Sequence, residues 1–198
     1  MKVDIREEEI ILKDFFTIYR SKMRFEHFDG TMSDVVNRLS LEKDEAIAVL
    51  VYHVTRDEYI LVRQFRYPLC HHDIDPWITE IVAGGIQPGE ELEKAAAREL
   101  EEEIGFVPLR LERITTCYVS PGIMNEKVTI FIAEVDDSSK INNGGGADEE
   151  DEDIELVWIP SKEANEWMSS QKVGDAKTII AMQWHLSREI TYNEKRRD

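Results

Sequence analysis

The stretch from Gly84 to Phe106, GGIQPGEELEKAAARELEEEIGF, constrains this chain more than any other part of it. Pro88-Gly89 interrupts the preceding structure, and the glutamates that follow suit the first turn of a helix, where the helix dipole favours negative charge. Three consecutive alanines favour helix, and Gly105 is a natural residue to end one. The sequence therefore predicts a helix between Gly89 and Gly105.

Three carboxylates crowd one face of this predicted helix. Glu99, Glu102 and Glu103 stand at i, i+3 and i+4, and Arg98 lies within reach of Glu102 to orient it. Such carboxylates repel one another unless a divalent cation lies among them, and a cluster without Cys or His favours Mg2+ or Mn2+. Metals there would neutralise a pyrophosphate and activate water. The opposite face is an apolar stripe of Leu92, Ala96, Leu100 and Ile104.

Composition narrows the class of protein. The chain has 198 residues and a formal net charge of −17, with no basic stripe, which argues against nucleic acid as a partner. Two cysteines, Cys70 and Cys117, do not suggest a disulfide framework. No long apolar run or signal-peptide pattern is present, so we expect a soluble cytoplasmic protein without a membrane partner.

Strand and helix patterns predict the fold class. Residues 1–44 alternate charged and apolar positions around a turn at Asp29-Gly30, which indicates a small antiparallel β region, and residues 45–198 then form the main domain. Strands that predominate early and helices that follow late suit an α/β/α sandwich around a mixed sheet. The expected strands are 46–52, 59–65, 77–82, 110–119, 127–135 and 155–159, and the expected later helices are 162–169 and 176–186.

The 84–106 stretch resembles a complete family signature. Its Gly84, Glu90, Arg98-Glu99-Leu100, Glu102-Glu103 and Gly105 have the identities and spacing that mark Nudix hydrolases, which cleave a nucleoside diphosphate linked to another moiety. The flanks resemble a narrower group, the ADP-ribose pyrophosphatases and related nucleotide-sugar hydrolases. The resemblance implies the Nudix α/β/α fold and Mg2+-dependent hydrolysis of ADP-ribose to AMP and ribose 5-phosphate. The resembling flanks are 27–33, 62–68, 120–126, 144–160 and 173–186.

The resemblance also implies the metal ligands. Glu99 and Glu103 would be the main ligands and catalytic residues, with Glu102 assisting. The backbone carbonyl of Ala83 would add a further oxygen. Glu90 would support the loop rather than bind metal.

Substrate-binding residues follow from the flanking segments in the same way. Arg66 in QFRYP resembles the residue that binds the pyrophosphate or the base-proximal part, and Arg63 is a weaker candidate. Glu126, at the end of SPGIMNE, resembles the acceptor for the terminal ribose hydroxyls. The amino-terminal region of such enzymes exchanges between subunits and helps bind adenine, which implies a homodimer and makes Phe28 a binding candidate.

A general base is expected in the acidic run 148–153, which follows a glycine-rich segment. A carboxylate on a loop of this kind can close on the attacking water when substrate binds. Alignment on the Glu-Asp-Ile triplet favours Glu152, and Glu150 and Asp153 remain alternatives. The contrary interpretation, a solvated acidic run, is common for such sequences.

Two other functions fit the same residues. Pro121, fifteen residues after Phe106, resembles a marker of ADP-ribose specificity, but GDP-mannose hydrolases share this segment and the acidic loop. Release of AMP or of GMP would distinguish the two. A sensor that binds ADP-ribose without cleaving it is the alternative outside enzymes. Sensors of this type usually lose carboxylates of the signature, and this chain keeps Glu99, Glu102 and Glu103.

Overall fold

A computed structural model of the chain describes residues 1–71, 74–146, 153–171 and 174–195, and side chains as far as residue 188. The chain divides into two compact units. Residues Met1–Glu45 and Cys117–Lys127 form the first, and residues Ala46–Thr116 and Val128–Asp198 form the second. The sequence patterns did not indicate that 117–127 groups with the amino-terminal residues.

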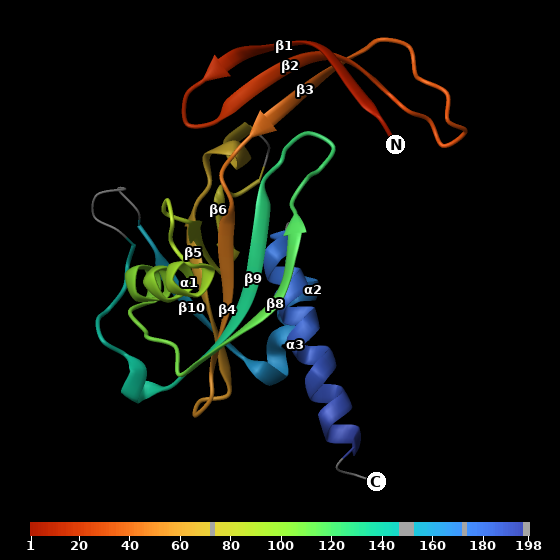
Figure 1. The fold of residues 1–198 in the computed structure, drawn as a ribbon. Coiled ribbons are helices and arrows are strands. Elements are labelled where there is room, and N and C mark those ends of the chain that lie inside the picture. The colour runs from red at the N-terminus through yellow and green to blue at the C-terminus, as the bar shows by residue number, and fades with distance from the viewer. Residues whose placement is uncertain (72–73, 147–152, 172–173, 196–198) are drawn as a thin grey trace. The chain divides into compact units, whose positions relative to one another are not determined.

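The first unit is built on a three-stranded antiparallel sheet in the order β1-β2-β3 (Figure 1). The strands are β1 (Val3–Lys13), β2 (Thr17–Phe25) and β3 (Val36–Glu42). Gly30, with a φ of 84°, lies in the expected connection between β2 and β3, but β1 was not expected as a separate strand. A bridge between Leu41 and Met124 brings the 117–127 segment beside the end of β3.

The second unit contains a mixed sheet in the order β10-β5-β4-β9-β8, with β6 paired to β5 and β7 paired to β4. The central pair β4 and β9 is parallel, whereas β5 and β7 run antiparallel to β4, so the expected mixed sheet is confirmed. The strands are β4 (Ala46–His53), β5 (Glu58–Phe65), β6 (Trp77–Glu80), β7 (Val82–Gly85), β8 (Arg110–Tyr118), β9 (Lys127–Val135) and β10 (Glu155–Pro160).

Helices cover both faces of this sheet (Figure 1). On one face α1 (Leu92–Glu99) continues into a π-helical turn, η2 (Leu100–Ile104). On the other, α3 (Ala176–Lys195) contacts β5 where the Tyr59 hydroxyl lies 2.7 Å from His185 Nδ1. The shorter α2 (Ala164–Ser170) follows β10. Because β4 is buried along most of its length, this is the expected α/β/α sandwich.

The core confirms the apolar stripe of the predicted helix. Ala96, Leu100 and Ile104 are fully buried, and Leu92 packs against the same cluster. Gly105 ends the helix in the left-handed region at a φ of 76°, as its position suggested. The π-helical turn was not expected, and such turns are frequent at functional sites. No helix in the described part of the chain is long and apolar enough to cross a membrane.

Candidate active site

The carboxylates of the α1–η2 helix lie at two depths. Glu99 and Glu103 keep only 9% and 1% of their surface exposed, while the Glu102 side chain keeps 39%. An ionised carboxylate is costly to bury unless positive charge or hydrogen-bond donors compensate it. The buried carboxylates of Glu99 and Glu103 therefore need positive charge or hydrogen-bond donors nearby. This need distinguishes them from the solvated carboxylates of an ordinary surface helix.

Gly84 provides the space for the Glu99 carboxylate. A β-carbon built on Gly84 would lie 2.0 Å from both Cδ and Oε1 of Glu99, closer than non-bonded atoms approach. Gly84 is on β7, directly after Ala83, the residue whose carbonyl is the predicted metal ligand. The glycine thus lets the strand pass directly beneath the helix carboxylate.

Arg98 joins the helix to the loop before it. Its Nη1 donates to Glu99 Oε1 at 2.7 Å and to Glu102 Oε2 at 3.0 Å, which confirms the expected reach to Glu102. Its Nε donates to Glu90 Oε1 at 3.1 Å, and its Nη2 donates to the Gly85 carbonyl at 2.9 Å. One guanidinium therefore fixes the geometry of two helix carboxylates relative to β7.

This network shifts two pKa values. The hydrogen bond to Glu90 is the main cause that raises the pKa of Arg98, with Glu99 and Glu102 adding to it against the effect of burial. The same hydrogen bond from Arg98, with the Gln87 N–H, lowers the pKa of Glu90. Glu90 therefore stays ionised and accepts a hydrogen bond from the loop before the helix, and its implied role away from the metal stays a prediction.

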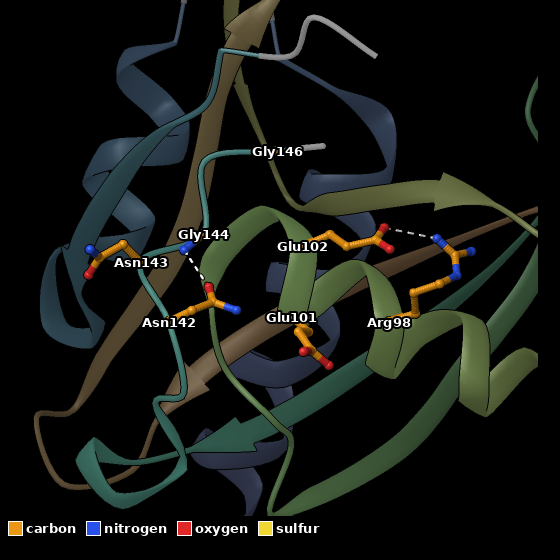
Figure 2. Close-up of a pocket in the computed structure, with 7 residues that line it drawn as sticks. All are labelled: Arg98, Glu101, Glu102, Asn142, Asn143, Gly144 and Gly146. Atoms are coloured by element: carbon orange, nitrogen blue, oxygen red, sulfur yellow. Dashed lines mark hydrogen bonds and ion pairs between the residues drawn. The ribbon is translucent and has the colours of Figure 1, made fainter. Parts of the chain in front are cut away.

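A cavity of about 520 Å3 opens beside the helix, where the segment 142–146 passes its carboxyl end (Figure 2). The Gly145 N–H donates to the Glu103 carbonyl at 2.9 Å, and the Gly146 N–H donates to the Glu102 carbonyl at 3.2 Å. These bonds satisfy carbonyls that a helix end leaves open. The lining residues are Arg98, Glu101, Glu102, Asn142, Asn143, Gly144 and Gly146.

Gly144 has the tightest approach in this segment. Its φ is 63°, and a β-carbon there would lie 2.4 Å from the Glu103 carbonyl oxygen. Asn142 also turns its side-chain oxygen back to the Gly144 N–H at 2.7 Å, as Figure 2 shows. The predicted base Glu152 and its alternative Glu150 follow this segment and lie outside the described residues, whereas Asp153 is exposed.

The two predicted arginines of β5 and its end have different surroundings. Arg66 donates from Nε to Glu80 Oε1 at 2.6 Å, and Glu80 is almost completely buried. Arg63 forms exposed ion pairs with Asp75 at 3.2 Å and with Glu155 at 3.6 Å. Arg66 is therefore paired with a buried carboxylate, whereas Arg63 has no buried ion-pair partner in the described part of the chain.

The remaining two predicted residues belong to the first unit. Glu126 is largely buried and pairs with Lys43 at 3.0 Å. Phe28 is 100% exposed in the connection between β2 and β3. Their roles toward a substrate stay predictions.

The donor set fits a hard divalent cation in its chemistry. Glu99, Glu102 and Glu103 offer carboxylate oxygens, and no thiol or imidazole is among them. Within the residues that the structure describes, however, no three acidic, His or Cys side chains converge closely enough to form a ready-made cation site. The Arg98 guanidinium bridges Glu99 and Glu102 instead. The assignment of Ala83 and the three glutamates as ligands therefore stays a prediction.

Comparison with known proteins decides the family. The NUDIX domain model matches residues 44–181, more than half of the chain. The chain belongs to the NUDIX family. The ADP-ribose pyrophosphatase of Escherichia coli is 34% identical over 97% of this Nudix chain and 92% of its own. The GDP-mannose pyrophosphatase of Cronobacter sakazakii is 32% identical over 94% of this chain and 95% of its own.

A solved structure supports the Nudix fold independently. The crystal structure of an ADP compounds hydrolase superposes with a TM-score of 0.74 at 22% identity, covering 98% of this chain and 96% of that one. The Nudix domain match begins at residue 44, so the first unit's sheet lies before it, and 117–127 lies within it.

Two charged residues beside Arg66 were not identified from the sequence. Glu80 and Lys177 were not predicted, although Lys177 Nζ lies 3.3 Å from Glu80 Oε2. They are 97 residues apart, and neither belongs to the Nudix signature. Only the packing of α3 against the β6–β7 junction brings them together.

Proposed function

We propose that this chain hydrolyses the pyrophosphate bond of ADP-ribose and related nucleoside diphosphate sugars, releasing AMP and ribose 5-phosphate from ADP-ribose. The observation that carries the proposal is the pair of buried carboxylates, Glu99 and Glu103, on a Nudix helix that Arg98 and Gly84 hold in place. The relatives that match nearly the whole chain support ADP-ribose as the leading substrate.

Magnesium is the cation we propose for this site, with manganese as a substitute. Glu99 and Glu103, assisted by Glu102 and the Ala83 carbonyl, would hold it. When bound, it supplies neutralisation of phosphate charge and a lower pKa for water. The absence of softer ligands in this set favours these ions over zinc.

The chain's own groups then have separate tasks. Arg98 donates to Glu99 and Glu102 and so limits the positions that their carboxylates can take up around a cation. Arg66 donates to the phosphates and stabilises negative charge that develops on them. Glu152 accepts the proton of the water that attacks phosphorus, and the bridging oxygen leaves with the other phosphate.

We also propose a homodimer in the cytoplasm, with no nucleic acid or membrane partner. The β1–β3 sheet exposes large apolar side chains that a single first unit leaves uncovered, which a second copy would bury. In such a dimer Phe28 would contact the adenine. Light scattering on the purified chain tests this, and a monomer at micromolar concentration would contradict it. The exposed residues are Val3, Ile5, Ile10, Ile11, Leu12 and Leu39.

GDP-mannose is the second candidate substrate, because a GDP-mannose pyrophosphatase matches this chain over nearly its whole length. Separation of reaction products by ion-exchange chromatography distinguishes the two, since ADP-ribose yields AMP and GDP-mannose yields GMP. A preference for GDP-mannose would retain the chemistry and reject ADP-ribose as the leading substrate.

A further inference from the structure

A buried chain of alternating charges lies behind Arg66. Glu80, with a side chain only 4% exposed, accepts from Arg66 Nε at 2.6 Å on one oxygen and from Lys177 Nζ at 3.3 Å on the other. Lys177 also donates to Asp175 at 2.6 Å. The four groups, two cations and two anions, are balanced in charge. Burial of charge at this depth is tolerated only with such pairing.

The far end of this chain of charges is fixed to the start of α3. One Asp175 oxygen accepts from the N–H and from the hydroxyl of Thr178, each at 2.8 Å, which caps the helix. The Thr178 hydroxyl oxygen in turn accepts from the Ile81 N–H at 2.9 Å, at the junction of β6 and β7. Glu80 is therefore held through its own strand and through Lys177.

The contact to Glu80 uses only one edge of the Arg66 guanidinium. Glu80 engages Nε, and among the described residues neither Nη group of Arg66 has a hydrogen-bond or ion-pair partner. A guanidinium binds a phosphate best through two parallel N–H groups. Because Nε donates to Glu80, the two Nη groups are the pair that remains to bind a phosphate. A free arginine side chain would first have to lose its rotamer freedom.

We propose that Glu80 is a positioning residue, which fixes the Arg66 guanidinium so that its two Nη groups meet a phosphate of the substrate, with Lys177 and Asp175 holding Glu80 in place. This inference rests on the proposed function, since it assigns Arg66 a phosphate to bind. It adds a residue outside the Nudix signature to the site. A merely structural Glu80 would instead stabilise the fold without acting through Arg66.

A double-mutant cycle on Arg66→Met and Glu80→Gln separates the two roles. The probe is the α,β-methylene analogue of ADP-ribose, whose carbon bridge water cannot cleave, measured by calorimetry with Mg2+. We expect Arg66→Met to raise Kd roughly ten- to hundredfold, from the size of charge-assisted hydrogen bonds. Glu80→Gln should raise Kd roughly three- to tenfold, because a neutral amide accepts a weaker hydrogen bond from Arg66 Nε than a carboxylate does and holds the guanidinium less firmly. In the double variant Kd should match Arg66→Met within about twofold.

The matched control is Glu112→Gln, which removes another carboxylate that bridges two cations, Arg110 at 2.8 Å and Arg188 at 2.5 Å. Its Kd should stay within about twofold of the wild-type value. Equal effects of Glu80→Gln in the wild-type and Arg66→Met backgrounds would overturn the positioning role.

Two further measurements keep the test decisive. If Glu80→Gln does not fold because Lys177 keeps only Asp175 as a partner, the cycle is repeated in a Lys177→Met background. Arg66→Met, Glu80→Gln and the two together are then compared without the buried lysine charge. Wild-type protein that binds the analogue but cleaves no nucleotide sugar would contradict the proposed function while the cycle still measures the positioning role. Wild-type protein that does not bind the analogue would overturn both.

Discussion

The carboxylate of Glu99 occupies the space in which any residue other than glycine at position 84 would place its β-carbon, 2.0 Å away. Gly84→Ala should therefore displace Glu99, whereas the backbone of Gly84 needs no positive φ and accepts alanine. We expect kcat/KM to fall at least about hundredfold, because misplacement of a catalytic group by 1 Å has that effect. The free energy of unfolding should fall by about 1–3 kcal/mol, the usual cost of an added methyl group in a packed site.

Gly85→Ala is the matched control for this prediction. A β-carbon at Gly85 would meet nothing within 4 Å, and its carbonyl stays available to Arg98. Steady-state kinetics and urea unfolding of both variants check the contrast. Equal activity losses in the two variants would contradict the prediction. They would show that any side chain on this strand lowers activity, whether or not it contacts Glu99.

Arg98→Lys tests the bridging role of the guanidinium. A lysine keeps the charge but cannot donate to Glu90, Glu99 and the Gly85 carbonyl at once. We expect the variant to lose about 2 kcal/mol of unfolding free energy from broken charge-assisted bonds. Its activity should fall by roughly a hundredfold through misplaced carboxylates.

The control is Arg110→Lys, because Arg110 also bridges two carboxylates, Glu112 and Glu134, but is largely exposed. Its stability should change by less than about 0.5 kcal/mol. Urea unfolding of Arg98→Lys that matched this control would contradict a structural role for the Arg98 network.

Gly144→Ala tests whether the 142–146 segment must dock on the helix end. Alanine there is strained at a φ of 63° and would contact the Glu103 carbonyl oxygen at 2.4 Å, which is backbone and cannot move aside. We expect a loss of about 1–3 kcal/mol in unfolding free energy. Activity should also fall, because the segment leads directly to Glu152. Hydrogen exchange of the Gly145 and Gly146 amides would report the loss of docking, and unchanged exchange would argue against it.

The pH dependence of stability should include a contribution from Asp175. Burial alone would raise its pKa, but the Lys177 charge and the bonds from Lys177 and Thr178 outweigh burial and lower it. A carboxyl whose folded pKa lies below its unfolded value of about 3.9 stabilises the fold above that value. This contribution is lost as pH falls from about 5 through the folded pKa.

Asp175→Asn removes the titrating group and retains a capping side chain. We expect it to cost about 2 kcal/mol at pH 7 through the lost charge interaction with Lys177. Urea unfolding of both proteins at pH 7, 5, 4 and 3 should show a difference that shrinks below about pH 4. A difference that stayed constant with pH would contradict the lowered pKa.

Local signals predicted much of the second unit. The apolar stripe of Leu100 and Ile104 and the stop at Gly105 identified the signature helix, because helix periodicity and a left-handed cap are properties of neighbouring residues. The buried strands β4 and β5 were also evident, since each contains a short continuous run of apolar residues. The π-helical turn was not, since nothing in LEEEI separates it from an α-helix.

The features that the sequence did not predict are of two kinds. One is a turn without glycine or proline, and the other is contact between residues far apart in the sequence. The β1–β2 turn at Asp14–Phe16 contains neither glycine nor proline, and the Asp14 side chain caps it by accepting from the Phe15 N–H at 2.8 Å. The pairing of Leu41 with Met124 and the approach of Lys177 to Glu80 join residues far apart in sequence. Such contacts are set by how strands and helices pack, which no local pattern records.

The most direct test of the account is turnover of ADP-ribose, GDP-mannose and ADP-glucose with Mg2+, measured by chromatography of the nucleotide products beside a Glu103→Gln control. Glu103 is nearly isosteric with glutamine, so the control removes charge at a buried position with little change in shape. We predict that ADP-ribose is cleaved fastest to AMP and ribose 5-phosphate, and that Glu103→Gln reduces kcat at least about thousandfold. Equal turnover by the Glu103→Gln variant, or binding without turnover by the wild-type protein, would contradict the account.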